Sequence, residues 1–263
     1  PCHPDPMTTH APAAPDTPPA PQKLSGYQKM VVGMLAFLQF AVILDFMVMA
    51  PLGAMIMPAL GITPAQFGLV VSAYAFSAGA AGLLAAGFAD RYDRKRLLLF
   101  FHAGFVLGTL WCGLAASFET LLLARIVTGL FGGVIGSVVL AIATDLFLPQ
   151  QRGRVIGLIQ TAFAASQVLG IPVGLFLSNH WGWQMPFLAM AVLGLLGGIA
   201  IAWRMRPVAD HLALPQEHTA WKHLFHTLTE RRYLLAFAVT ALVSTGGFML
   251  MPFGSAFSVN NLG

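Results

Sequence analysis

Charged residues are what this sequence has least of. Asp, Glu, Lys and Arg make up 9% of its 263 residues, whereas about 25% is usual for a soluble domain. Apolar residues make up 57% of the chain, and the mean hydropathy is +0.75. This small number of charges cannot cover a water-facing surface. The composition therefore excludes an ordinary soluble protein and predicts an integral membrane protein.

Cysteine is almost as scarce, and nucleotide-binding loops are missing. Cys2 and Cys112 lie too far apart in the predicted topology to suggest a disulfide or a metal site. The sequence has no glycine-rich loop ending in Lys-Ser or Lys-Thr. Beyond the first residues, the longest stretch between apolar runs is 204–232, which is too short for a catalytic domain. We therefore expect no enzyme and no cofactor, and an ion gradient as the energy source.

Apolar runs of helical length fill most of the chain. Crossing a hydrocarbon core of roughly 30 Å takes about 20 residues of α-helix. The predicted membrane helices are 30–56, 65–89, 97–116, 120–145, 154–178, 183–203 and 233–257. The sequence therefore predicts an all-α integral membrane fold with seven spans.

The basic residues predict the orientation of these spans. All but one of the 14 Lys and Arg residues lie in the amino-terminal tail or in the second, fourth and sixth connections. The other three connections contain none, and their ionisable groups are Glu119 and His180. Basic loops face the cytoplasm, so the amino terminus is expected there. The net charge of +4 then reflects topology, and no nucleic-acid partner is predicted.

The second connection has an unusual sequence, "GFADRYDRKR" from residue 87. Anchoring by positive charge accounts for its arginines and lysine, but not for Asp90 or Asp93. The stretch resembles the loop 2/3 signature of the major facilitator superfamily, G-x-x-x-D-R-x-G-R-[KR]. The corresponding positions are Gly87, Asp90, Arg91, Arg94 and Lys95, although Gly87 lies one residue nearer to Asp90 than the pattern places its glycine. A second departure is Asp93, where the family usually has glycine.

Two further motifs are similar to those of the same family. "ARIVTGLFGG" resembles its R-x-x-x-G motif at Arg125 and Gly129. "GIPVG" is similar to a relaxed form of the antiporter signature G-P-x-x-G-G, at Gly170, Pro172 and Gly174. Together with "LDFMVMAPLG", the pattern resembles the 12-helix drug:proton antiporter branch, including the arabinose-efflux-like permeases. That resemblance implies the major facilitator fold, of which this chain would hold the first six-helix half and helix 7.

An internal repeat supports that organisation. "FMVMAPLGA" from Phe46 and "FMLMPFGS" from Phe248 are alike, although a chance match of apolar residues is also open. The expected parts of the chain are a disordered cytoplasmic tail at 1–22, a six-helix half at 23–203, a cytoplasmic inter-half loop at 204–232 and the first helix of a truncated second half at 233–263. The tail holds eight prolines, and Met7 is a candidate translation start.

Asp45 and Arg125 are the charged residues that fall inside predicted spans. Because each is costly in the membrane unless paired or hydrated, they are the main functional candidates. The functional interpretation makes Asp45 a proton-titrating or cation-binding carboxylate, with Arg125 biasing its affinity for protons. The structural interpretation is a fixed buried pair, or an arginine that only reaches the interface.

Other polar residues in the spans are weaker candidates. Gln160 and Gln167 are seven residues apart on one helix face, while Gln39 and Tyr74 add donors on the first two spans. They could line a cavity, or they could simply join helices by hydrogen bonds. The glycines of "GLFGGVIG" have small-xxx-small spacing, which predicts close packing of the helix at 120–145.

The predicted function is a proton-coupled secondary transporter that exports a small amphipathic molecule, a drug-like compound or a sugar, by alternating access. Its partners would be that molecule, protons and the lipid bilayer of the inner (plasma) membrane, and the complete protein is expected to be monomeric. Proton-coupled uptake, a non-transporting membrane sensor and a membrane-embedded enzyme remain as alternatives. The sequence names neither the substrate nor the direction of transport.

The family resemblance also suggests a charged latch that stabilises the outward-facing state. In this hypothesis Asp90 and Arg91 form the latch, and Asp145, at the end of the fourth span, receives the arginine. Arg94 and Arg96 would then serve mainly as topological anchors.

Overall fold

The computed structural model describes residues 24–85, 89–209, 229–230, 233–243 and 245, and its described part is built from helices. The long helices are α1 (Gly26–Leu60), α2 (Pro64–Ala85), α3 (Arg94–Gly113), α4 (Phe118–Leu146), α5 (Pro149–Ala165), α6 (Ile171–Trp181) and α7 (Met185–Arg204). A 3-10 turn, η1 (Ala89–Arg91), precedes α3, and a π-helix, η2 (Ser166–Gly170), joins α5 to α6. Because α5, η2 and α6 form one continuous span, the described chain has six helices long and apolar enough to cross a membrane.

Six of the seven predicted spans are confirmed, and their ends follow from local sequence. Ser25 begins α1 with a capping box, in which its hydroxyl accepts from the N–H of Gln28. Gly61 ends α1 in the left-handed conformation, with φ of 62°. Ser117 caps α4 in the same way as Ser25 caps α1. These caps place the boundaries of α1 four residues outside the predicted range at each end.

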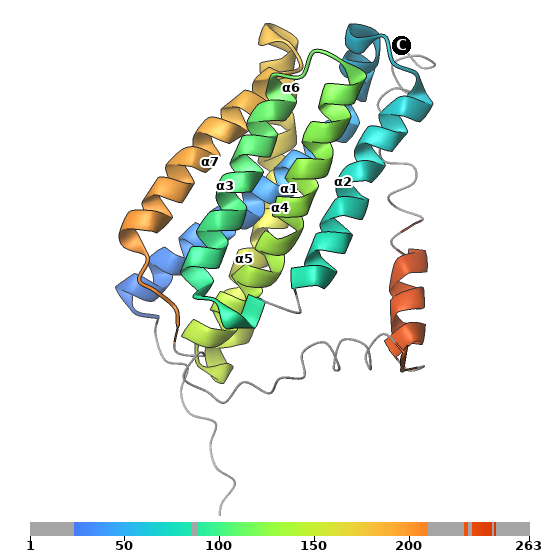
Figure 1. Cartoon of the computed structure of the whole chain (residues 1–263). Helices are drawn as coiled ribbons and strands as arrows, with labels where there is room; N and C mark the ends of the chain where they lie inside the picture. Colours follow the sequence, from blue (N-terminus) through green and yellow to red (C-terminus); the bar gives the residue numbers. More distant parts are fainter. Residues whose placement is uncertain (1–23, 86–88, 210–228, 231–232, 244, 246–263) are drawn as a thin grey trace, which may run out of the picture.

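The seventh predicted span is described only at its start. Residues Tyr233–Val243 form an apolar helix that stands apart from the other helices in Figure 1 and whose side chains are exposed. The predicted tail at 1–22, most of the inter-half loop and the repeat partner Phe248 lie outside the described residues.

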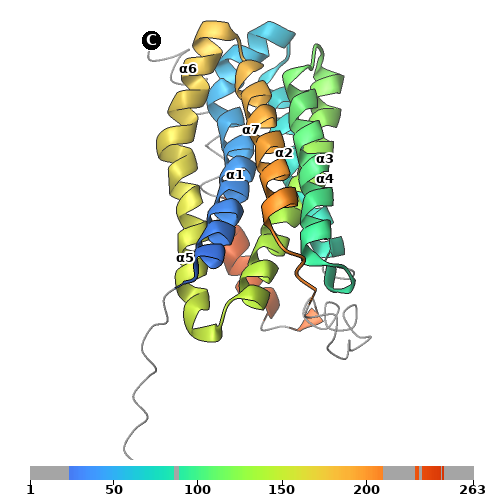
Figure 2. The same cartoon turned by 90° about the vertical axis from the view of Figure 1, so that its left-hand side faces the viewer.

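The six spans form an upright bundle (Figures 1 and 2). Helix α4 packs against both α2 and α3, α3 packs against α7, and α1 packs against α5. One end of the bundle carries the start of α3, the start of α5 and the end of α7, so Arg91, Arg94, Arg154 and Arg204 gather there. We call this the basic end.

The core of the bundle is divided into two apolar clusters. One, toward the basic end, includes Leu35, Phe105 and Ile135. The other, toward the opposite end, includes Leu52 and Phe67. The level between them is where α1, α2, α3 and α4 each place a polar side chain, as described below.

Glycines bring α2 and α4 into close contact. A Cβ atom added to Gly133 would collide with the backbone of Ala78, and one added to Gly129 would collide with Ser77 and the carbonyl of Tyr74. The small-xxx-small prediction for α4 is therefore confirmed.

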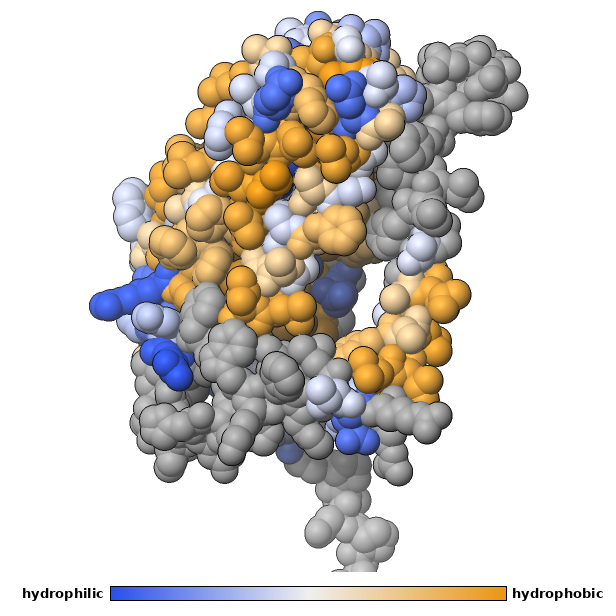
Figure 3. Space-filling model, turned by 45° about the vertical axis from the view of Figure 1, so that its right-hand side comes forward, coloured by the Kyte–Doolittle hydropathy of each residue, from blue (hydrophilic) through white to orange (hydrophobic). Residues whose placement is uncertain are grey.

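Apolar side chains also cover the outside of the bundle. Figure 3 shows them across the middle of one face, with most of the strongly hydrophilic residues nearer the ends. Phe76, Leu107 and Trp203 are among the exposed ones. Such a surface would be unstable in water and suits a surrounding of lipid acyl chains.

The chain leaving α7 folds back onto the basic end. The backbone N–H of Arg206 donates to the Tyr27 hydroxyl at 2.9 Å, and the N–H of Arg94 donates to the carbonyl of Val208 at 3.1 Å. Lys95 Nζ donates to the carbonyl of Ala202 at 2.8 Å. These bonds tie the starts of α1 and α3 to the segment that leads out of the bundle.

Candidate functional site

The polar level between the two core clusters is built around an ion pair. Arg125 Nη1 donates to Asp45 Oδ2 at 2.6 Å, and both side chains are fully buried. The same nitrogen lies 3.3 Å from the backbone carbonyl of Asp45. The two residues thus form a direct contact between α1 and α4, and the interpretation in which Arg125 only reaches the interface is wrong.

Two neighbouring helices complete this site. Thr109 of α3 donates its hydroxyl to Asp45 Oδ1 at 3.2 Å, so both carboxylate oxygens have a partner. Tyr74 of α2 lies beneath Arg125, with the guanidinium carbon 4.2 Å from the ring centroid. This cation–π arrangement differs from the hydrogen-bonding role expected for Tyr74. The four residues Asp45, Arg125, Thr109 and Tyr74 are called the charged layer below.

Arg125 retains hydrogen-bonding capacity within this layer. Its Nε and Nη2 atoms are buried and have no hydrogen-bond partner among the described residues. Buried donors without partners are costly, so a water or an acceptor group of a ligand would be stabilised here. The ion pair is therefore close, but it leaves two donors of Arg125 unsatisfied within the described residues.

Thr109 was missed in the sequence because a threonine in a membrane helix has many ordinary roles. A usable signal was the chemistry of Asp45, since one arginine nitrogen cannot satisfy both oxygens of a buried carboxylate. The second oxygen of Asp45 therefore needs another donor on a neighbouring helix, and the sequence does not identify that donor.

The predicted glutamines are not part of the charged layer. Gln39 of α1 is half-buried and faces Gly136 of α4, where an added Cβ would lie 3.8 Å from its Oε1. Gln160 of α5 and Gln167 of η2 are exposed on the described bundle. None of the three glutamines forms a hydrogen bond to Asp45 or Arg125. Their proposed cavity role therefore rests on the sequence alone.

The antiporter-type motif lies at an irregular point of the fifth span. Pro172, at the start of α6, has no N–H to donate to the preceding turn, and the π-helix η2 ends two residues before it. A Cβ at Gly170 would collide with Leu44, and one at Gly174 would collide with Val48. The motif therefore lets this span approach α1 at the turn that holds Asp45.

At the basic end, the structure corrects the predicted partner of Asp145. Arg94 Nε donates to Asp145 Oδ2 at 3.1 Å, whereas Arg91 is exposed. Arg94 is the first residue of α3 and its side chain faces α4. The register of the first turn of α3 therefore brings Arg94, rather than Arg91, to Asp145. It is buried, and its Nη1 also donates to the carbonyl of Ala89 at 3.1 Å. Arg94 is thus a structural partner in this cluster, a role that the expectation of a mainly topological anchor did not include.

The other residues of the loop make separate structural contacts. Asp93 caps α3 by accepting the backbone N–H of Arg96 at 2.9 Å, which explains the aspartate where the family usually has glycine. Lys95 binds the end of α7, as noted above. Gly87 and the side chain of Asp90 lie outside the described part of the chain.

Comparison with known proteins identifies the family. The Major Facilitator Superfamily model matches residues 35–263, which is most of the chain. The chain therefore belongs to the major facilitator superfamily, and it is a multi-pass membrane protein of the all-α fold predicted above.

Its relatives include several named transporters and resistance proteins. The uncharacterized MFS-type transporter YceJ of Bacillus subtilis is 29% identical over 81% of this chain and 54% of its own length. Multidrug resistance protein fnx1 of Schizosaccharomyces pombe is 32% identical over 52% of this chain and 26% of its own. The Methylenomycin A resistance protein of Streptomyces coelicolor is 32% identical over 68% and 38%. The chain thus spans about half or less of the length of these relatives.

A solved structure has the same fold. An inward-facing, unoccupied bacterial homolog of the human lysosomal transporter Spinster superposes with a TM-score of 0.73 and 21% identity. The match covers 90% of this chain and 56% of that one. This similarity defines the fold and carries no information on substrate.

Proposed function

We propose that the complete protein is a proton-coupled secondary transporter that exports a small amphipathic molecule by alternating access, rather than an enzyme. The observation that carries the proposal is the Asp45–Arg125 pair, buried at the centre of the bundle and joining α1 to α4. The names of two relatives, a multidrug resistance protein and a methylenomycin A resistance protein, favour drug-like cargo, with sugars as the second class.

The charged layer suggests how a proton could be coupled to movement. A proton taken up by the Asp45 carboxylate removes its negative charge and with it most of the attraction to Arg125 Nη1. Arg125 then seeks an acceptor elsewhere, and α1 and α4 lose their main polar contact. Loss of the proton restores the pair. Each turnover would therefore move one proton through Asp45 while the two helices change their separation.

Uptake is the second candidate, because one relative carries that name. The vacuolar membrane amino acid uptake transporter fnx2 of Schizosaccharomyces pombe is 34% identical over 52% of this chain and 23% of its own length. The same proton step at Asp45 would serve either direction, so the charged layer does not discriminate between them.

The basic end supports a second part of the proposal, a latch that closes this end in the outward-facing state. It comprises Arg94 and Asp145, which are in contact, with Asp90, Arg91 and Gly87 as family-motif members. In this scheme the protein lies in the plasma membrane with its amino terminus and basic end in the cytoplasm. A cysteine at Asp93 should be labelled only from inside, and one at His180 only from outside; the reverse pattern would overturn this orientation.

Transport measurements on the protein in its full encoded length test the coupling. Reconstituted into vesicles with an imposed pH gradient, it should move ethidium, a small amphipathic cation, against its concentration gradient. Asp45→Asn keeps the size of the side chain but cannot take up a proton, so uphill transport should fall at least 50-fold while downhill movement persists.

Glu119→Gln is the matched control, since Glu119 is an acidic residue of α4 at the opposite end from the basic cluster. It should transport as the unmodified protein does. Uphill transport by Asp45→Asn at the wild-type rate would refute proton coupling through this residue. If ethidium is not moved at all, the same comparison applies to amino acid and sugar gradients.

A further inference from the structure

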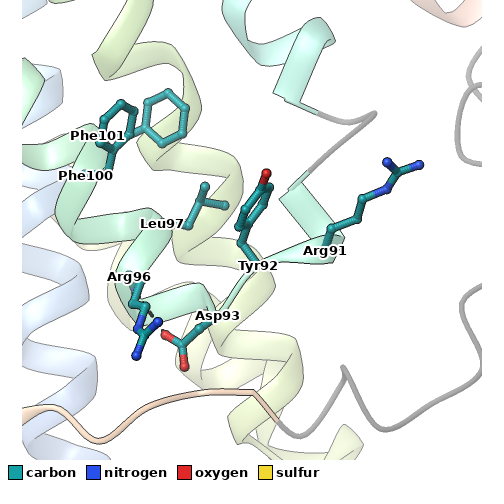
Figure 4. A pocket seen from close by; sticks show the side chains of 7 residues that line it. All are labelled: Arg91, Tyr92, Asp93, Arg96, Leu97, Phe100 and Phe101. Carbon is teal, nitrogen blue, oxygen red and sulfur yellow. Dashed lines mark hydrogen bonds between the residues drawn. The ribbon is translucent and has the colours of Figure 1, made fainter.

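A cavity of about 590 Å³ opens at the basic end, beside the first two turns of α3 (Figure 4). Its polar rim consists of Arg91, Tyr92, Asp93 and Arg96, and its floor of Leu97, Phe100 and Phe101. None of these residues belongs to the charged layer. Neither Arg91 nor Arg96 takes part in the Arg94–Asp145 contact.

The rim offers two cations. Arg91 and Arg96 are exposed, and Figure 4 shows them on either side of the Tyr92 ring. Neither forms an ion pair with another residue of the described chain. The one carboxylate of the rim, Asp93, already accepts the N–H of Arg96 as the cap of α3. Among its described residues the rim therefore carries two positive charges and one negative charge, and this excess of positive charge can attract an anion.

The floor lies deeper along the same helix and is apolar. Leu97 and Phe101 are buried, but the Phe100 ring is 63% exposed. It lies 5.3 Å from the Phe101 ring and 5.9 Å from the Phe131 ring of α4, between ring centroids. At 1.5 Å per residue, Phe100 is about 6 Å farther into the span than Arg96. Basic groups at the rim are thus followed, one turn deeper, by an aromatic surface.

We propose that this cavity binds an anionic phospholipid from the leaflet at the basic end, with its phosphate at Arg91 and Arg96 and an acyl chain along Phe100. The order of charge and apolar surface along α3 is that of a phospholipid across the membrane boundary, a phosphate followed by hydrocarbon. Clusters of basic residues next to a membrane helix are known to recognise anionic headgroups. Tyr92 has the amphipathic ring that prefers this depth. A free phosphate would leave the aromatic floor unused.

Lipid binding to the purified full-length protein tests the proposal, with native mass spectrometry counting bound lipids in detergent. Phosphatidylglycerol should bind tighter than phosphatidylcholine with the same acyl chains. One basic residue near an anionic surface contributes roughly fivefold in affinity, so Arg91→Gln with Arg96→Gln should lower phosphatidylglycerol binding by more than tenfold and remove the preference. Arg91→Lys with Arg96→Lys should retain it.

The matched control is Arg154→Gln with Arg204→Gln, which removes two exposed charges from the same end away from the cavity. It should change binding less than twofold. Phe100→Ala should weaken long-chain phosphatidylglycerol but not its six-carbon analogue. Equal affinity for the two headgroups, equal loss in both double variants, or equally tight binding of inorganic phosphate would overturn the proposal. If another segment of the protein fills the cavity, the protein will show no lipid selectivity. That result would also overturn the proposal.

Discussion

The two charged pairs of this bundle differ in their surroundings. Asp45 and Arg125 are fully buried between apolar clusters, whereas Arg94 and Asp145 lie at the basic end with 7% and 23% of their side chains exposed. Water can solvate the second pair when it opens, but nothing in the described core can solvate the first. Opening the interior pair would therefore leave a buried charge without its counter-charge, whereas the groups of the end pair lie nearer to solvent.

In the proposed mechanism this difference would separate coupling from gating. The interior pair would link helix movement to proton uptake, and the end pair would only favour one conformation over another.

The largest effect is expected when one member of the interior pair is removed. Asp45→Ala leaves the Arg125 guanidinium buried without a counter-charge, so the free energy of unfolding should fall by about 3–5 kcal/mol. Titration with a denaturing detergent, followed by the loss of helical circular dichroism, measures it. Asp45→Leu combined with Arg125→Met should recover most of the loss, because no charge is then left unpaired. A loss below about 1 kcal/mol for Asp45→Ala would mean that water already reaches the pair.

Packing of α2 against α4 should come next. Gly133→Ala drives a Cβ into the backbone of Ala78, so stability should fall by about 1–3 kcal/mol. Gly79→Ala, on α2 with open space around it, is the control and should be neutral or slightly stabilising. Equal stability of the two variants would show that the helices can separate without cost. The same unfolding titration provides the comparison.

Removal of the Thr109 hydroxyl should have a smaller effect on the interior pair. Thr109→Val preserves shape but deprives Asp45 Oδ1 of its donor, which should lower stability by about 1 kcal/mol. Thr109→Ser keeps the hydroxyl donor, so its stability and transport should match those of the unmodified protein. If valine and serine behave alike, the hydroxyl has no part in the charged layer.

The end pair should show the smallest change in stability. Arg94→Gln breaks the contact with Asp145 and should reduce stability by about 0.5–1 kcal/mol, with greater labelling of a cysteine placed at Gln39 from the basic end. Arg96→Gln is the control, because the side chain of Arg96 makes no ion pair in the described structure. Equal effects of the two substitutions would mean that Arg94, like Arg96, serves only as a topological anchor.

The spans themselves were predictable because hydropathy depends on composition alone. Asp45 and Arg125 were identified for a related reason. A charged residue inside an apolar run is rare, because it is costly in the membrane unless it has a partner. Capping residues such as Ser25 set the helix ends, yet they shift a boundary by only a turn.

Pairings that depend on register were not predictable. Arg91, Arg94 and Arg96 are chemically alike and close in sequence, and only the first turn of α3 decides that Arg94 faces Asp145. Gln160 and Gln167 are both exposed on the fifth span, so their seven-residue spacing did not say whether the face they share points into the bundle. Tyr74 was found as a polar residue, but its stacking under Arg125 needed three-dimensional placement.

The proposed transport cycle requires Asp45 to take up and release a proton at each turnover. Infrared difference spectroscopy on the reconstituted full-length protein observes this step, because a protonated carboxyl group has its own carbonyl stretching band. Lowering the pH should produce that band in the unmodified protein and in Glu119→Gln, substrate should shift it, and Asp45→Asn should abolish it. A band that persists in Asp45→Asn, or its absence from the unmodified protein across the pH range of transport, would mean that Asp45 does not carry the coupling proton.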